Sequence, residues 1–207
     1  MSQPLKLLAL AAAGFGLLML PGVWRIRPYY KRRRLRGSLE TVADAVAASR
    51  ASQLSDWELV AFAQRLVNEK FVFYSLRNLW DPPGRAFAYG MGYCTQYNLA
   101  LKQILDRLGV ANRAVYAFPV QVLDNPAWRM GHTWLRVQVG DEERDVCAGR
   151  PGNAPGRVHF RPLGTVREGN GPLLFLTHLG TILVSGASEW RSVLTGRPAP
   201  PWALRRN

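Results

Sequence analysis

An uncharged apolar run near the N-terminus constrains this chain more than any other feature. The run extends from Leu7 to Trp24 and contains 18 residues. As a helix it would be about 27 Å long, just enough to cross a hydrocarbon core of about 30 Å with little tilt. We expect Pro21 to end this helix near the far interface, because proline removes a backbone donor and clashes with the preceding turn.

The charges on the two sides of this run predict its orientation. Only Lys6 precedes it, whereas seven basic residues follow within the basic flank 25–36. Basic residues are retained on the cytoplasmic side, so we predict a membrane-anchored protein whose body faces the cytoplasm. The basic flank would also meet anionic headgroups. A cleaved signal peptide is the main alternative, but no small-x-small cleavage site follows the run.

A net charge of +13 is typical of a nucleic-acid-binding protein, but here most of the charge lies at one end of the chain. Residues 1–36 carry +8 with no acidic residue, so the rest of the chain carries only +5. A basic arm rarely follows a long apolar run, and we expect no nucleic-acid partner. We therefore divide the chain into an anchor with its basic flank, residues 1–36, and one catalytic domain, residues 37–207. The two cysteines lack zinc spacing, and we expect no metal and no cofactor.

The body is predicted to begin with helices and end with strands. Residues 37–54 indicate a modest helix or spacer, and Ser55 with Glu58 forms a capping-box pattern before a helix that ends near Lys70. A turn region is expected at 81–84, and a further helix begins at Cys94 and ends before Gly109. The strands that we predict from alternation and apolar runs are 114–118, 132–139, 142–147, 173–175 and 181–184.

A cysteine, a histidine and an aspartate, in that order, carry the candidate chemistry. Cys94 follows glycines and opens a helix, where unpaired N–H groups and the helix dipole would lower its pKa. In the roles we assign, Cys94 attacks an acyl carbon, His132 takes and returns the proton, and Asp145 orients the imidazole. The Cys94 N–H is one expected oxyanion donor. The second donor stays open among Trp80, Tyr74 and Gln96.

The predicted hairpin after His132 determines where Asp145 lies relative to His132. If the turn pairs Val139 with Glu142, Asp145 lies opposite Arg136 on the His132 face but some four residues along the strand. A tighter turn or a bulge must close that gap.

Each residue of this set also has a plainer interpretation. A lone cysteine is usually a small buried hydrophobe, and a strand histidine is usually structural. We assign His159 and His178 no role in the site. We expect Cys147 to lie near the site as a packing residue, or as a partner for oxidised Cys94.

The sequence around these residues resembles the transglutaminase-like superfamily. Residues 92–115 contain its G-x-C pattern, a helix ending in L-G-[IV] and the strand that follows, and residues 131–137 resemble its H-x-W-x-x-V strand. The resemblance covers residues 55–150. The resemblance implies a papain-like α+β fold in which the cysteine helix packs on an antiparallel sheet. It also implies that Cys94, His132 and Asp145 form the catalytic triad. Two details resemble the arylamine N-acetyltransferases of this superfamily: Asn98 four residues after Cys94, and the run 145–149.

These observations predict a membrane-anchored thiol enzyme that acts on a protein or peptide substrate. It would form a Cys94 thioester with an amide or peptide group, released by water or by an amine. One alternative is an acetyltransferase of the same fold that uses an acyl-CoA donor. Another is a non-catalytic peptide-binding module, because a fold alone does not license a function.

Overall fold

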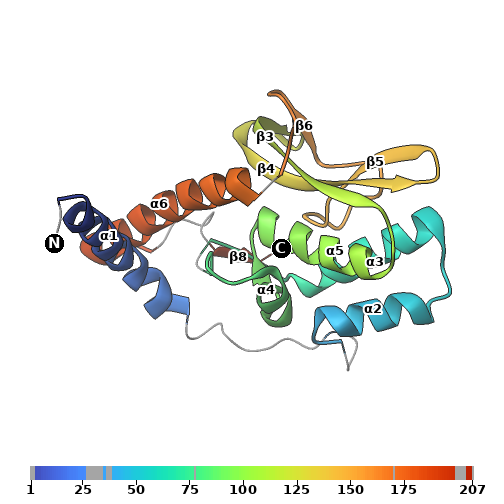
Figure 1. Cartoon of the computed structure of the whole chain (residues 1–207), viewed down its shortest axis with the longest axis horizontal. Helices are drawn as coiled ribbons and strands as arrows, with labels where there is room; N and C mark the ends of the chain where they lie inside the picture. The colour runs from blue at the N-terminus through green and yellow to red at the C-terminus, as the bar shows by residue number, and fades with distance from the viewer. Residues whose placement is uncertain are drawn as a thin grey trace.

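The computed structural model describes residues 3–26, 35, 39–76, 78–169, 171–198 and 204–206. Most of the basic flank 25–36 lies outside these ranges, and side chains 21–26 are not described. The described elements are of the α+β class: a helical layer packs against an antiparallel sheet, and two long helices lie at one end (Figure 1). The predicted fold class is therefore confirmed.

The helices of the body form where the sequence provides helix starts. They are α2 (Val42–Ala51), α3 (Asp56–Lys70), α4 (Pro83–Tyr89) and α5 (Cys94–Arg107). A capping box between Thr41 and Asp44 starts α2. The box predicted at Ser55 is wrong, because its hydroxyl bonds to the Asp56 carboxylate and caps no backbone N–H. The predicted turn region at 81–84 continues into α4, because a proline at the first helical position favours a helix start.

The main sheet holds the strand on which His132 lies. Its strands are β3 (Asn112–Val122), β4 (Asn125–Val139), β5 (Glu142–Val146), β6 (Phe160–Pro162) and β7 (Arg167–Glu168). Their order is β5–β4–β3–β6, with β7 also paired to β3, and all these pairs are antiparallel. The predicted register, Val139 opposite Glu142, is confirmed. Helix α5 packs against β3 and β4, as Figure 1 shows.

A second, small sheet lies beside the start of α5. Strand β1 (Phe73–Ser75) pairs in parallel with β2 (Met91–Gly92) and antiparallel with β8 (Leu204–Arg206). Because β2 ends two residues before Cys94, this sheet places the beginning of α5. A Cβ at Gly92 would come within 2.9 Å of the Phe71 ring, so close packing requires glycine there.

Helix α1 (Gln3–Ile26) continues through Pro21, which corrects the expectation that this proline ends it. Proline lacks the N–H that would bond to the carbonyl four residues earlier. That carbonyl belongs to Leu17, and it accepts a hydrogen bond from Trp190 Nε1 at 3.1 Å. A side chain of a neighbouring helix thus supplies the donor that the proline lacks.

The predicted strands at 173–175 and 181–184 are wrong, because both stretches belong to helix α6 (Gly171–Thr195). Its buried residues include Ile182, Ser185, Gly186 and Glu189, which recur at helical spacing. This face packs on α1, and a Cβ at Gly186 would lie 3.0 Å from the Leu18 carbonyl oxygen.

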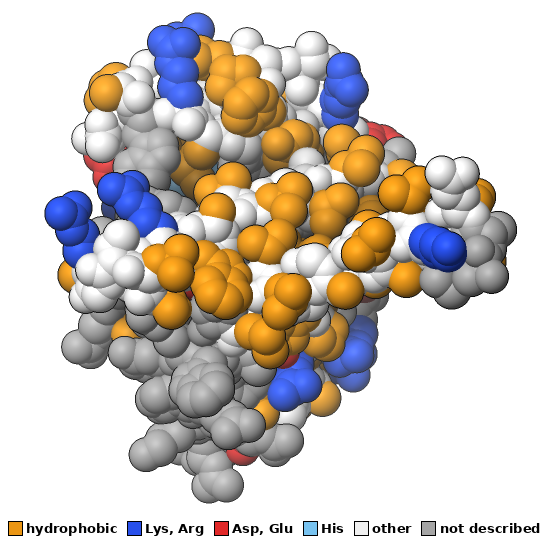
Figure 2. Space-filling view, turned by 90° about the vertical axis from the view of Figure 1, so that its left-hand side faces the viewer, with side chains coloured by type: hydrophobic (Ala, Val, Ile, Leu, Met, Phe, Trp, Pro, Cys, Tyr) orange, Lys and Arg blue, Asp and Glu red, His pale blue; other side chains and the backbone are white. Residues whose placement is uncertain are grey.

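Both α1 and α6 are long and apolar enough to cross a membrane, by length and composition. Apolar side chains gather over this end of the molecule, with blue basic side chains toward its margins (Figure 2). The large exposed apolar residues of the two helices are Leu5, Leu7, Leu8, Leu10, Phe15, Leu17, Leu20, Phe175, Leu176, Leu183, Val184, Val193 and Leu194.

Candidate active site

The start of α5 is held by the side chain of Gln96. Its Oε1 accepts the Tyr93 N–H at 3.2 Å, and its Nε2 donates to the carbonyls of Asn78 at 2.7 Å and Asp81 at 2.9 Å. Both amide hydrogens are therefore engaged by the backbone. Gln96 fixes the loop before the helix, and it is not the second oxyanion donor that the sequence left open.

Cys94 is the first residue of α5, as predicted, and its side chain lies against β4. It is only 6% exposed, and its Sγ lies 4.0 Å from Thr95 Oγ1. The Thr95 hydroxyl in turn contacts Thr133 Oγ1 at 3.1 Å, one residue beyond His132. The structure thus brings the start of the cysteine helix to the histidine strand.

The His132 ring lies in a buried aromatic cluster and touches a thiol. Its Nε2 is 3.4 Å from Cys147 Sγ, and its ring stacks on Trp134 with centroids 6.2 Å apart. The Phe160 ring approaches edge-on at 4.4 Å. Among the residues that the structure describes, no hydrogen bond joins His132 to Cys94. The thiol in direct contact with the imidazole is that of Cys147, which the sequence placed near the site as a packing residue or as a partner for oxidised Cys94.

Asp145 does not reach His132. Its Oδ1 accepts hydrogen bonds from Trp134 Nε1 at 2.8 Å and Arg136 Nε at 3.2 Å. The β4–β5 register is regular from Val139 to Leu135, so no bulge closes the gap of four residues, which is about 13 Å of strand. The role expected for Asp145, orienting the imidazole directly, is therefore not the arrangement found. Its contact with the site runs through Trp134, the ring stacked on His132.

Asn98 joins the elements that carry the two cysteines. It is fully buried on α5, and its Nδ2 donates to the Thr133 carbonyl at 2.7 Å. Its Oδ1 accepts the Ala148 N–H at 3.0 Å, and its Nδ2 lies 3.6 Å from Cys147 Sγ. One amide thus fixes α5, β4 and the segment after β5 relative to one another. The sequence marked Asn98 only through a family resemblance.

Burial keeps the thiols and the imidazole in their neutral forms. Burial raises the pKa of Cys94, an effect that the Thr133 N–H opposes only in part. The expectation of a low pKa for Cys94 is therefore wrong, because burial outweighs the helix start. Burial, followed by the charge of His159, lowers the pKa of His132 to about 3. Burial likewise raises the pKa of Cys147 to about 12.

His159 and His178, assigned no role from the sequence, both lie at the site. The His159 ring meets His132 edge-on at 5.8 Å, and its Nδ1 lies 3.0 Å from Asn153 Nδ2. His178, on α6, contacts the Tyr93 hydroxyl through Nδ1 at 2.6 Å. No pattern in the sequence connected either histidine with Cys94. Among the described residues, no group of three or more His, Cys, Asp or Glu side chains is arranged to hold a metal ion.

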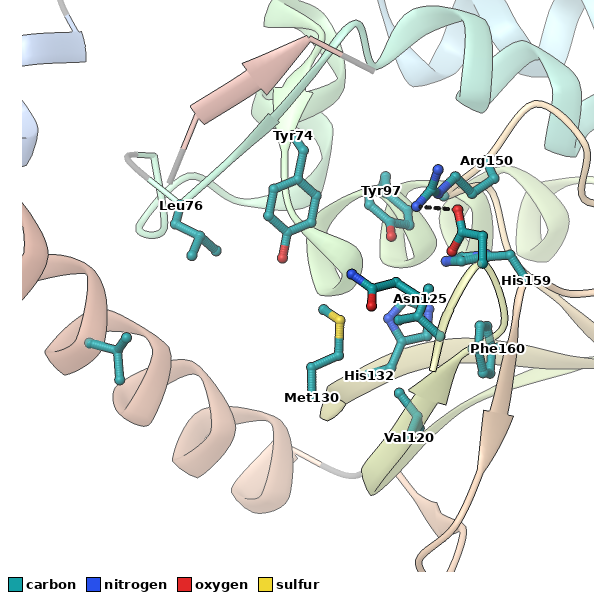
Figure 3. A pocket seen from close by; sticks show the side chains of 14 residues that line it. Tyr74, Leu76, Tyr97, Val120, Asn125, Met130, His132, Arg150, His159 and Phe160 are labelled. Atoms are coloured by element: carbon teal, nitrogen blue, oxygen red, sulfur yellow. Dashed lines mark ion pairs between the residues drawn. The ribbon is translucent and has the colours of Figure 1, made fainter. Parts of the chain in front are cut away.

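A cavity of about 630 Å³ opens beside His132 (Figure 3). Its wall includes His132, Tyr97 and Gly149 from the body, together with Val184 from α6. Neither cysteine lines it. Tyr74, one candidate oxyanion donor, also borders the cavity, whereas Trp80 does not. The imidazole is thus the group of the predicted triad that faces the open space.

Two solved structures are similar to this one. One, described as a TGase, matches with a TM-score of 0.41 and 17% sequence identity, over 59% of this chain and 33% of that one. The other, described as "a Putative Cysteine Protease from Cytophaga hutchinsonii", matches with a TM-score of 0.42 and 13% identity, over 70% of this chain and 53% of that one. This chain thus spans between a third and about half of their lengths. No family model and no curated protein matches the sequence. The function is therefore argued from the site.

Proposed function

We propose that the protein is a membrane-anchored thiol enzyme that cleaves or transfers acyl groups from amide or peptide substrates through a Cys94 thioester. One observation carries the proposal: Cys94 begins α5, the next residue Thr95 contacts Thr133 on β4, which is the neighbour of His132 in the chain, and His132 faces the cavity. A thiol and an imidazole brought together from a helix start and a strand are the parts that nucleophilic catalysis needs. The body would face the cytoplasm, where a free thiol stays reduced.

The proposed reaction moves the thiol proton of Cys94 to His132 and from there to the leaving amine. Cys94 gives its proton to His132 as its sulfur bonds to the acyl carbon, and the amine leaves with that proton. Water or a second amine then cleaves the thioester and restores the thiol. The Cys94 backbone N–H, unpaired in the first helical turn, is positioned to stabilise the oxyanion. Cys147 replaces Asp145 as the group in contact with the imidazole.

Trapping the acyl-enzyme tests this assignment. The full chain in detergent is incubated with 7-amino-4-methylcoumarin amides of acetylated peptides and of acyl chains, then quenched in acid. We expect an acyl adduct on Cys94 that neutral hydroxylamine removes, and its loss in Cys94→Ala and His132→Ala. An adduct on Cys147 would overturn the choice of nucleophile. Equal product release by the parent and Cys94→Ala would overturn the thiol mechanism.

A second candidate function, a non-catalytic binding module, is favoured by the neutral state of the site. Burial raises the pKa of both thiols and lowers the pKa of His132 to about 3, so the resting groups are not activated. In the free protein, iodoacetamide labelling of Cys94 should be slow at pH 6 and keep rising above pH 8.5. The two functions then differ in turnover: a binding module retains its ligand and releases no coumarin.

A further inference from the structure

The cavity beside His132 has two unlike ends (Figure 3). Toward α6 its wall is apolar and includes Leu76 and Val184. At the opposite end Arg150 forms an ion pair with Asp124 at 3.2 Å. His132 lies between these ends, as the figure shows. A molecule that fills the cavity would therefore present an apolar part to α6 and a polar part to Arg150, with the intervening atoms near the imidazole.

Helix α6 is attached to the site at the residue before the nucleophile. His178 Nδ1 lies 2.6 Å from the Tyr93 hydroxyl, and their rings are 6.0 Å apart. Val184, six residues or about 1.7 turns further along α6, lines the cavity. The apolar end of the cavity is thus bounded by the same helix that packs on α1.

The outer side of this helix pair has the surface expected of a protein in contact with lipid. Leu8 is 70% exposed and Leu176 is 63% exposed. Figure 2 shows apolar side chains gathered over this end of the molecule. The described part of α1 that forms a candidate span has none of its residues buried. A helix that is apolar on all sides requires an apolar surrounding, and the basic flank after α1 suits anionic headgroups. We take the bilayer as the occupant of this surface.

We propose that the cavity takes the long apolar chain of a membrane-borne acyl amide, with the chain toward α6 and the polar head toward Arg150. The proposal rests on the proposed function and names its substrate class. The Cys94 sulfur does not line the cavity in the free protein, so the proposal requires it to reach the cavity wall when substrate binds. It then bonds to the acyl carbon as the carbon–nitrogen bond breaks, and the amine leaves with the thiol proton carried by His132. Water then cleaves the thioester, which releases a fatty acid and restores the thiol.

The size of the cavity supports a chain rather than a small acyl group. Its volume, about 630 Å³, falls within the range of cavities that enclose most of a small-molecule ligand. Transfer of each methylene from water into the cavity changes an equilibrium by about fourfold. For probes that enter from water, a few methylenes inside the cavity therefore give a clear dependence on chain length.

Chain length is the first test, with the full protein in nanodiscs of phosphatidylcholine and phosphatidylglycerol. The probes are acetyl, octanoyl and palmitoyl amides of 7-amino-4-methylcoumarin. We expect kcat/KM for the octanoyl amide to exceed that for the acetyl amide by tenfold or more, and both to vanish in Cys94→Ala. Equal rates for acetyl and longer amides would overturn the substrate class and leave the thiol function intact. Cleavage of none of them would overturn the proposed function.

The α6 wall is tested with two adjacent residues. Both residues are about half exposed, Val184 at 59% and Leu183 at 47%, but only Val184 lines the cavity. Val184→Trp adds a ring at the apolar end of the cavity, whereas Leu183→Trp adds the same ring away from it. The ratio of palmitoyl to acetyl kcat/KM should fall at least tenfold in the first variant and stay unchanged in the second. Equal ratios in both would overturn the role of α6.

A binding measurement keeps this inference independent of turnover. Dansyl-undecanoic acid is titrated into Cys94→Ala in the same nanodiscs, with empty nanodiscs as the blank. Val184→Trp should weaken its affinity about tenfold, and Leu183→Trp should not. No protein-dependent binding would overturn the substrate class even if short amides are cleaved.

Discussion

The body and the α1–α6 helix pair both contain leucine-rich helices, but the leucines are buried in the body and exposed in α1. In α5, Leu101 and Leu105 are fully buried on one face against the sheet, and the opposite face carries polar groups. In α1, Leu8 and Leu10 are each 70% exposed. The difference is in patterning: α5 has one apolar face, whereas α1 is apolar on all sides. The leucines of α5 are thus stabilised by burial within the body, whereas those of α1 stay at the surface of the protein.

One leucine from each region gives the largest contrast. Leu101→Ala should lower the free energy of unfolding by about 2–5 kcal/mol, because it leaves a cavity in the body. Leu8→Ala should change it by no more than about 0.5 kcal/mol. Chemical denaturation in detergent, followed by tryptophan fluorescence, measures both. Equal losses would mean that α1 packs as a core helix.

Removing the Asn98 amide should affect the body on a similar scale. Asn98→Ala leaves the Thr133 carbonyl and the Ala148 N–H without this partner, which costs about 2–6 kcal/mol at about 1–3 kcal/mol for each buried group. The matched control is Asn68→Ala, whose half-buried amide donates, among the described residues, to the Ala148 carbonyl alone. Denaturation curves for the two variants give the comparison, and a control loss as large as that of Asn98→Ala would contradict this assignment.

The helix pair should respond to a side chain placed between its members. Gly186→Leu would put a Cβ 3.0 Å from the Leu18 carbonyl oxygen and should weaken the α1–α6 contact by about 1–3 kcal/mol. Gly180→Leu is the control, because no atom lies within 4 Å of its Cβ position. Faster hydrogen exchange in α6 for the first variant alone, with unchanged exchange in α5, is the expected result. Exchange that rises equally in both variants would refute the close contact.

The body should also lose stability in acid through His132. Its folded pKa of about 3 lies below the ordinary value of 6.5, so the unfolded chain binds the proton first as the pH falls. Stability is fully present above pH 6.5 and decreases toward pH 3, by about 1.4 kcal/mol for each pH unit. Denaturation midpoints between pH 7 and pH 5 should therefore fall less steeply in His132→Gln. Identical slopes would place the titrating group elsewhere.

The sequence predicted the body better than the helix pair, for physical reasons. Helix α5 and the β4–β5 register follow from local periodicity and a two-residue turn, both of which lie within a short window. The stretches 173–175 and 181–184 are short apolar runs, which do not distinguish a strand from a helix. The continuity of α1 through Pro21 depends on Trp190, far away in the chain.

The same distinction applies to the candidate site. The positions of Cys94 and His132 could be predicted because Cys94 begins a helix and His132 belongs to an alternating stretch of β4, although that strand begins earlier, at Asn125. The contact between Cys147 and His132 could not, because it depends on how the segment after β5 folds back through Asn98. The pKa of Cys94 was predicted from its place at a helix start, but burial, which no local pattern measures, decides its direction.

The strand pairings on either side of α6 limit how many times the chain crosses a bilayer. Three residues before α6 the chain pairs with β3 through β7, and after it the chain returns to β1 through β8. Both flanks are thus tied to the body, so in the proposed membrane-anchored arrangement they lie on its side of the bilayer and the number of crossings between them is even. The eight residues 196–203 are too few for a second crossing, since a spanning helix needs about 20. In that proposed arrangement α6 therefore stays on the side of the body, and α1 is the one described helix that crosses.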